Sequence, residues 1–184
     1  RSAAPGWAVG DRAAVIPFAL CADCEPAGDC RDGLVPVCPA MRGLGFSPAA
    51  PGGYAQQVRV RASQALRLPD AVSLHDGALL EPLAVAAHAV ALARIGPGMR
   101  VLVIGAGPIG LGVAALARLA GADHVVVSEP AAGRRGRALT VGATAVIDPL
   151  AEDPGPVFRA ADVIIECVGI PGMIDRPSRM YDPS

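Results

Sequence analysis

The sequence predicts an α/β protein, with a β-rich amino-terminal part followed by a parallel sheet that helices cover on both faces. Three observations predict this class. Short apolar runs separated by turn residues fill positions 10–60, strands alternate with helices after Pro97, and a glycine-rich turn follows the first of those strands. Such alternation is typical of parallel sheets, whose strands are buried on both faces.

The composition excludes several classes of protein. The chain has 184 residues, 52% hydrophobic and 18% charged, which is typical of a folded globular chain. Its net charge of −1 does not indicate binding to nucleic acid, which favours a basic surface. No apolar run reaches the roughly 20 residues needed to cross a bilayer, and no export signal is visible, so we expect a soluble cytoplasmic protein.

The order of elements follows from the pattern. An Ala- and Leu-rich stretch predicts a helix between Val72 and Ile95, which Gly96-Pro97-Gly98 ends. Strands are expected at 99–105, 124–129, 145–149 and 161–169, and helices at 110–121 and 133–142. We therefore divide the chain into a β-rich part over 1–70, a connecting helical segment over 71–97 and a part with alternating strands and helices over 98–184.

The strongest local signal is the glycine-rich turn with Gly105, Gly107 and Gly110 between a strand and a helix. This is the context of the Rossmann fingerprint, in which the glycines allow a tight turn, approach of the pyrophosphate and close helix packing. The helix amino terminus offers N–H groups to the phosphates. The alternative is that these glycines serve only the packing of helix on strand.

Glu129 ends the next strand, 24 positions after Gly105. The fingerprint expects an acidic residue about 20 positions on, which binds the adenosine ribose hydroxyls. A carboxylate there repels a 2′-phosphate, so the sequence favours NAD over NADP. Arg134 and Arg135 follow closely and partly offset that repulsion.

Four of the five cysteines lie close together, at Cys21, Cys24, Cys30 and Cys38. In a reducing compartment this clustering favours a metal site over disulfides, with free thiols as the other alternative. Cys167 lies in an apolar strand and is expected to be a small buried hydrophobic residue. His75, His88 and His124 show no metal-ligand spacing, and none is given a catalytic role.

Several motifs together resemble the zinc-dependent medium-chain alcohol and polyol dehydrogenase family. They are GDR, the cysteine cluster, GGYAQQV, LLEPLAVAAHAV, GAGPIGLG and VVVSEP, in this order up to about Gly172. The EPL and SEP motifs are most similar to the 2,3-butanediol, threonine and sorbitol dehydrogenase branch. The resemblance implies that 1–70 is the remnant of a GroES-like catalytic domain with a zinc lobe, and that 98–184 is a partial NAD-binding Rossmann domain.

The resemblance also implies roles for individual residues. Cys21, Cys24, Cys30 and Cys38 match the four ligands of a structural zinc, although five residues separate Cys24 from Cys30 where the family has two. Glu81, which by residue type alone would be read as a helix-cap or surface carboxylate, matches a residue that ligates the catalytic zinc or bonds its water. Val85 matches one that packs near the nicotinamide. Cofactor contacts are implied for the glycine-rich turn and its surroundings: Gly105, Gly107, Pro108, Ile109, Gly110, Glu129 and Arg134.

The implied reaction is hydride transfer from a secondary alcohol, diol or polyol to NAD, with zinc as Lewis acid. The family's main catalytic residues match positions upstream of Arg1, so none is assigned here. We therefore expect a fragment of a family member, truncated at both ends and inactive alone, whose intact form is a homodimer or homotetramer. The alternatives are a zinc-free NADPH-dependent quinone or enal reductase of the same superfamily, and a non-catalytic zinc-ribbon interaction module.

Overall fold

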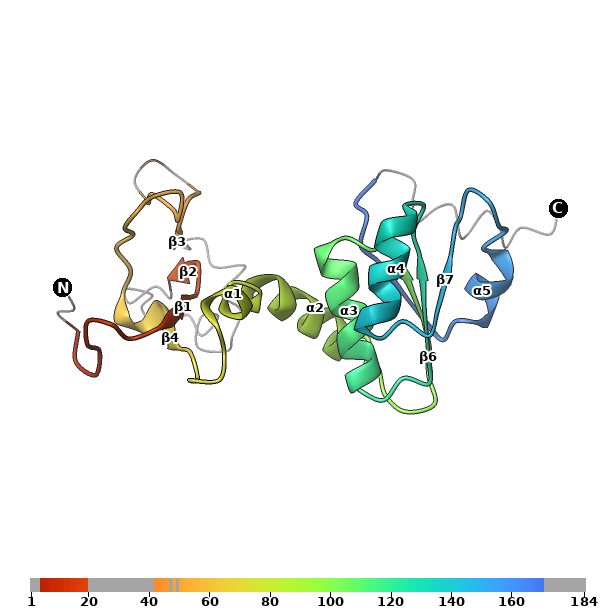
Figure 1. Cartoon of the computed structure of the whole chain (residues 1–184), viewed down its shortest axis with the longest axis horizontal. Helices are drawn as coiled ribbons and strands as arrows, with labels where there is room; N and C mark the ends of the chain where they lie inside the picture. The colour runs from red at the N-terminus through yellow and green to blue at the C-terminus, as the bar shows by residue number, and fades with distance from the viewer. Residues whose placement is uncertain (1–3, 20–41, 47, 49, 171–184) are drawn as a thin grey trace, which may run out of the picture. The chain divides into compact units, whose positions relative to one another are not determined.

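The computed structural model describes residues 4–19, 42–46, 48 and 50–170 (Figure 1). The chain divides into two compact units, Arg1–Leu80 and Glu81–Ser184. The cysteine cluster over 21–38 lies outside the described residues.

Unit 1 is built from short strands. β1 (Ala13–Val15) pairs antiparallel with β4 (Ala65–Arg67), and β2 (Phe18–Ala19) pairs with β3 (Arg42–Gly43). The 3-10 helix η3 (Ala62–Gln64) leads into β4 and carries the buried Gln64. The Gln64 amide donates to the carbonyl of Ile16 at 3.1 Å and accepts the N–H of Arg61 at 3.1 Å, so a buried polar group is satisfied.

The prediction of one helix between Val72 and Ile95 is wrong in one respect, because the structure has two helices there. α1 (Leu74–Gly77) and α2 (Leu80–Leu92) are separated at Ala78 and Leu79. Pro82 explains the break, since proline in a helix interior lacks the N–H for the residue four positions earlier, here Ala78, and clashes with its carbonyl. Gly77 also lies tightly against Leu68, where a Cβ would be 2.7 Å from Cδ1.

Unit 2 contains a four-stranded parallel sheet in the order β7-β6-β5-β8. β5 (Arg100–Ile104) lies between β6 (His124–Ser128) and β8 (Val163–Glu166), and β7 (Ala145–Ile147) lies beyond β6. The chain thus runs outward from β5 through β6 to β7 and then crosses to β8 on the other side. This reversal of direction between β5 and β8 is a topological switch point, where open α/β sheets bind ligands.

Helices cover both faces of this sheet, as the sequence predicts (Figure 1). α3 (Pro108–Leu119) and α4 (Ala132–Val141) pack with α2 on one face, where Val101, Val103, Val125 and Val127 form the core. α5 (Gly155–Ala160), which the pattern does not predict, places Phe158 against Leu102 and Ile104 on the other face. Within the described part of the chain, no helix is both long and apolar enough to span a membrane.

Candidate dinucleotide-binding site

The glycine-rich turn lies at the carboxyl end of β5 and requires its glycines. Gly105 has φ +96, a left-handed conformation that favours glycine, and its N–H donates to the carbonyl of Ser128 in β6 at 2.8 Å. A Cβ on Gly110 would lie 2.0 Å from the carbonyl oxygen of Gly105. The first and third glycines therefore bring the start of α3 directly against the end of β5.

The amino terminus of α3 is open to a ligand. Gly107 is its N-cap and makes no side-chain capping bond, and Pro108 is the first helical residue. A Cβ added at Gly107 would meet no atom within 4 Å, so there is space for a group to approach the backbone here. The early N–H groups of a helix lack intrahelical acceptors and carry partial positive charge, which suits a phosphate.

Glu129 lies beside this turn, directly after β6, and is only 4% exposed. Its Oε2 accepts the N–H of Ala106 in the turn at 2.9 Å, and its Oε1 accepts the N–H of Ala131 at 2.9 Å. The carboxylate is therefore held at the turn in a fixed orientation. A carboxylate oxygen has more than one lone pair, so it can still accept a ribose hydroxyl.

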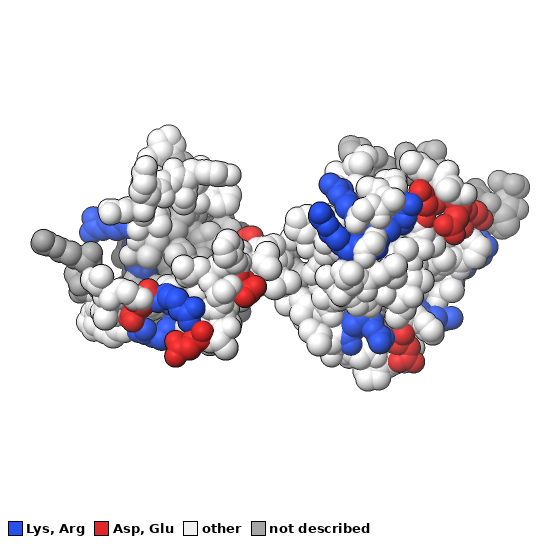
Figure 2. Space-filling view, viewed as in Figure 1, with Lys and Arg blue, Asp and Glu red and all other residues white. Residues whose placement is uncertain are grey.

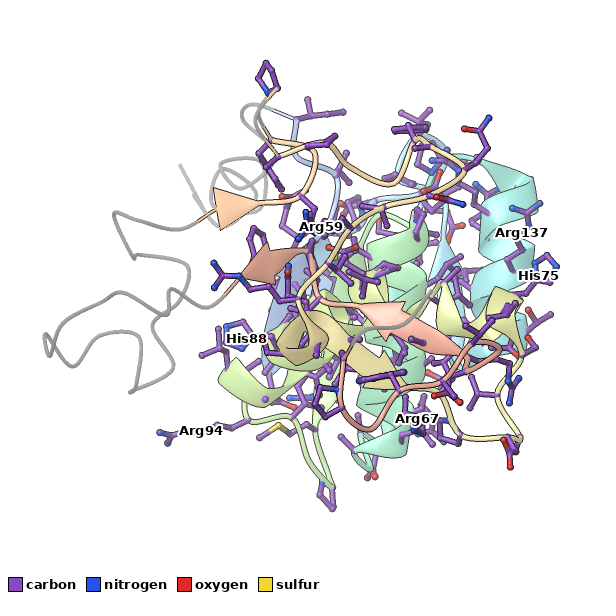
Figure 3. All side chains as sticks on the ribbon, turned by 90° about the vertical axis from the view of Figure 1, so that its left-hand side faces the viewer. Arg59, Arg67, His75, His88, Arg94 and Arg137 are labelled. Carbon is purple, nitrogen blue, oxygen red and sulfur yellow. The ribbon has the colours of Figure 1, made fainter. Side chains whose placement is uncertain are left out.

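Two arginines of α4, Arg134 and Arg135, lie near Glu129 but differ in how firmly other groups hold them. Arg135 is held by the carbonyls of Glu129 and Pro130, at 2.8 and 2.6 Å, and by Asp148 at 3.0 Å. Arg134 is 59% exposed, with its Nη1 3.9 Å from Glu129 Oε2. Figure 2 shows basic side chains gathered over α4, and Arg137 extends from this helix (Figure 3). Of the arginines near Glu129, Arg134 has the greater freedom to reach a bound ligand.

The end of β8 forms a further wall of the turn, which the sequence analysis did not identify. The N–H of Cys167 donates to the carbonyl of Ile104 at 2.9 Å, and Val168 Cγ2 lies 2.7 Å from where a Gly105 Cβ would be. Glu166 Oε1 accepts the N–H groups of Val168 and Gly169 at 2.5 and 3.0 Å. An acid three residues before a glycine at a strand end is the signal that could have pointed to this loop.

Cys167 is half-buried, with its Cβ 3.5 Å from an ideal Gly110 Cβ. Burial, and secondly the charge of Glu166, raises the pKa of its thiol to about 11. It is therefore a neutral thiol near neutral pH and packs against the glycine-rich turn.

The other residues considered in the sequence analysis lie away from the turn, His75 in unit 1 and the rest in unit 2. Glu81 is exposed in the first turn of α2, and Val85, one helical turn later, is 49% exposed. His75 and His88 project from α1 and α2 (Figure 3), and they are exposed, as is His124. Among the residues that the structure describes, no three His, Cys, Asp or Glu side chains gather as a metal site.

A hollow of about 380 Å³ lies on the α5 face of the sheet. Its lining includes Arg100 and His124, the first residues of β5 and β6. It is therefore at the amino edge of the sheet, whereas the glycine-rich turn is at the carboxyl edge. Because parallel α/β sheets bind ligands at the carboxyl edge, the turn is the better candidate for a dinucleotide site.

Comparison with known proteins agrees with this geometry. Residues 1–70 match the alcohol dehydrogenase GroES-like domain, and residues 108–183 match the zinc-binding dehydrogenase family. L-galactonate-5-dehydrogenase of Escherichia coli K12 is 40% identical over 151 residues, covering 82% of this chain and 42% of that protein. Sorbitol dehydrogenase of Bacillus subtilis 168 is 32% identical over 172 residues, covering 90% of this chain and 48% of that protein.

Solved structures show the same likeness. A protein described as a zinc-binding dehydrogenase from Sinorhizobium meliloti 1021, bound to NADP, has a TM-score of 0.84 and 36% identity, covering 97% of this chain and 53% of that one. An alcohol dehydrogenase from Escherichia coli CFT073 in complex with NADH has a TM-score of 0.82 and 28% identity, covering 95% and 52%. The chain spans about half the length of the curated relatives it matches.

Proposed function

We propose that this chain, which belongs to the zinc-dependent medium-chain alcohol and polyol dehydrogenases, carries the cofactor site of an oxidoreductase. The proposed reaction is hydride transfer from a secondary alcohol, diol or polyol to NAD. The observation that supports it most is Glu129, buried and hydrogen-bonded to Ala106 beside an open helix amino terminus.

Each part of the turn has a proposed task. Gly105 and Gly110 bring strand and helix together, and Gly107 leaves space for the pyrophosphate. The N–H groups of Ile109 and Gly110, in the first turn of α3, donate to phosphate oxygens. Pro108 suits the first helical position because the N–H that proline lacks would have no intrahelical acceptor there. Glu129 accepts the adenosine ribose hydroxyls. On α2, Val85 packs near the nicotinamide.

We propose NAD as the preferred cofactor. Glu129 is held by two N–H groups and so cannot easily turn away from a 2′-phosphate, which its charge repels. The exposed Arg134 weakens this preference. Relatives of known structure contain NADP in one case and NADH in another, so both forms of nicotinamide cofactor occur in this fold.

Zinc is proposed at two sites. Four cysteine thiolates, from Cys21, Cys24, Cys30 and Cys38, suit a tetrahedral structural zinc, and Glu81 offers a carboxylate to a catalytic zinc or its water. When bound, a catalytic zinc supplies Lewis-acid chemistry and NAD accepts the hydride. The exposed position of Glu81 in α2 leaves its carboxylate accessible for this role.

The remaining proposals concern organisation and substrate. We keep the division into 1–70, 71–97 and 98–184, with a homodimer or homotetramer of the whole enzyme in the cytoplasm. Relatives named as sorbitol and L-galactonate-5-dehydrogenases favour a polyol or sugar-acid substrate. They are dehydrogenases, so they favour neither a quinone reductase nor a zinc-ribbon module. The closer similarity to butanediol dehydrogenases stays a prediction.

Calorimetric titration of the chain with NAD and NADP tests the function. We expect binding of NAD, and a loss of about tenfold in NAD affinity in Glu129→Gln, since the amide loses the charge that accepts ribose hydroxyls. Glu152→Gln, which changes an exposed carboxylate after β7, is the matched control and should bind NAD normally. Absence of NAD binding by the unchanged chain would refute the proposal, and tighter NADP binding would refute the cofactor preference.

Elemental analysis tests the structural zinc. Purified without chelator, the chain is expected to hold about one zinc, which Cys30→Ser should lose because a closed structural site needs four ligands. Cys167→Ser is the control and should keep its zinc, since Cys167 lies in unit 2 beside Gly110. Equal zinc in the unchanged chain and Cys30→Ser would exclude Cys30 as a ligand.

A further inference from the structure

Two loops of different origin border the switch point between β5 and β8, where open α/β sheets bind ligands in a crevice. One is the turn between β5 and α3, which begins at Gly105. The other is the Val168–Gly169 loop that follows β8, the strand on the other side of β5. Since ligands bind in the crevice at this point, the position of the second wall sets the width available to the cofactor.

Three contacts hold the Val168–Gly169 loop. The N–H of Cys167 donates to Ile104, which continues the pairing of β8 with β5 for one more residue. Val168 packs its Cγ2 against Gly105, at 2.7 Å from an ideal Cβ. A single oxygen of Glu166 accepts both N–H groups of the loop, at 2.5 and 3.0 Å.

Without Glu166, the Val168–Gly169 loop would be held only by the Cys167 hydrogen bond and the packing of Val168, and its own two N–H groups would lose their acceptor. Gly169 has φ +71, and Val168 and Gly169 are both exposed, so water can replace the carboxylate at their N–H groups. Glycine allows many backbone conformations at low cost. Hydrogen bonds to a charged acceptor are about twice as strong as neutral ones, so Glu166 favours the one conformation in which Val168 covers Gly105.

We infer that Glu166 is a positioning residue, which holds the Val168–Gly169 loop against Gly105 and so presets the far wall of the cofactor crevice. This inference rests on the proposed function, because the ligand is the nicotinamide cofactor. With both N–H groups taken by Glu166, the loop presents the apolar Val168 side chain to the crevice, and phosphate binding is left to α3.

Three variants of the chain test the inference by calorimetric titration with NAD. Glu166→Ala removes the acceptor, and NAD affinity is expected to fall about tenfold, because the loop must then be ordered on binding. Glu166→Gln keeps a side-chain oxygen that can accept, and should restore affinity to within about twofold of the unchanged chain. Hydrogen exchange of the Val168 and Gly169 amides without NAD should be faster in Glu166→Ala and near normal in Glu166→Gln.

Asp153→Ala is the matched control. Asp153 Oδ1 accepts the N–H of Gly155 at 2.9 Å, the same bond to a residue two positions on, but at the start of α5. The Asp153→Ala variant should have lower thermal stability but unchanged NAD affinity. The inference is overturned if Glu166→Ala binds NAD like the unchanged chain, or if Asp153→Ala loses as much affinity. No NAD binding by the unchanged chain would refute the proposed function, and the inference with it.

Discussion

The two edges of the parallel sheet use their carboxylates in different ways. At the amino edge, Asp162 accepts the N–H of Arg100 at 2.8 Å and pairs with its guanidinium at 3.0 Å, and both side chains are exposed. At the carboxyl edge, Glu129 is buried and Glu166 accepts two loop N–H groups. The amino-edge carboxylate joins two neighbouring strands, whereas the carboxyl-edge carboxylates shape the loops around a crevice.

This difference follows from the direction of the strands. In a parallel sheet, every strand enters at one edge and leaves at the other, so loops that lead into α3 and α4 lie together at the carboxyl edge. Carboxylates there meet backbone N–H groups of turns and helix starts. An exposed pair at the amino edge is surrounded by water and screened by salt.

The largest expected effect is that of Gly110→Ala at the carboxyl edge. The new Cβ would lie 2.0 Å from a backbone oxygen, so α3 must move away from β5. We expect a loss of about 3 kcal/mol in the free energy of unfolding of unit 2, at the upper end for overpacking, and loss of NAD binding. Denaturant unfolding and calorimetry measure these quantities.

Gly136→Ala is the control for that substitution. A Cβ on Gly136 would meet no atom within 4 Å, and the residue lies inside α4. Alanine is favoured over glycine in a helix by about 0.5 to 1 kcal/mol, so stability should rise. If Gly110→Ala is as stable as Gly136→Ala, the close contact between turn and helix is not as described.

The next effect is that of Glu129→Ala. This change leaves the N–H of Ala106 in a buried region without its acceptor, and it opens a cavity beside the turn. We expect unit 2 to lose about 2 kcal/mol of unfolding free energy, measured by urea denaturation. Glu152→Ala removes an exposed carboxylate and serves as the comparison. If Glu129→Ala loses less unfolding free energy than Glu152→Ala, the burial of Glu129 is contradicted.

A smaller, pH-dependent effect is expected for Asp162→Asn at the amino edge. The Arg100 guanidinium and N–H lower the pKa of Asp162 from its ordinary value of 3.8. The ionised carboxylate therefore contributes stability that is fully present above 3.8 and is lost as the pH falls through the lowered pKa. The variant should have a lower thermal midpoint than the unchanged chain near neutral pH, and the two should converge in strong acid.

Salt provides a check on that prediction. The difference between Asp162→Asn and the unchanged chain should shrink at about 1 M salt, because exposed charges are screened over a few ångströms there. An asparagine can still accept the Arg100 N–H. If the difference in thermal midpoint persists in strong acid and high salt, the substitution has weakened this hydrogen bond and not the charge pair.

The smallest effect concerns reactivity. With a pKa of about 11, Cys167 should be alkylated very slowly at neutral pH, and the rate should rise about tenfold per pH unit until the pH approaches that value. Mass spectrometry of its peptide measures the rate. Glu166→Gln removes a charge that raises this pKa and should speed alkylation slightly, and a slower rate would contradict the effect of the Glu166 charge on the thiol.

Much of unit 2 could be predicted from the sequence. The apolar run of β5, the glycines around Gly107 and the acid at Glu129 are short-range signals, so their order along the chain already predicts strand, turn, helix and strand. The break between α1 and α2 could also have been predicted from Pro82. α5 was missed because six residues between Pro154 and Ala161 are too few to show a helical period.

The proposed cofactor site divides in the same way. The sequence by itself determined the glycine-rich turn and the identity of the acid beside it, because strand, turn and helix follow one another and sterics leave only glycine at Gly105 and Gly110. Only the tertiary structure decided that Glu166 and Val168 form the opposite wall. They lie about 60 positions further along the chain, and only the placement of β8 beside β5 brings them to Gly105, since strand order is a property of the folded sheet.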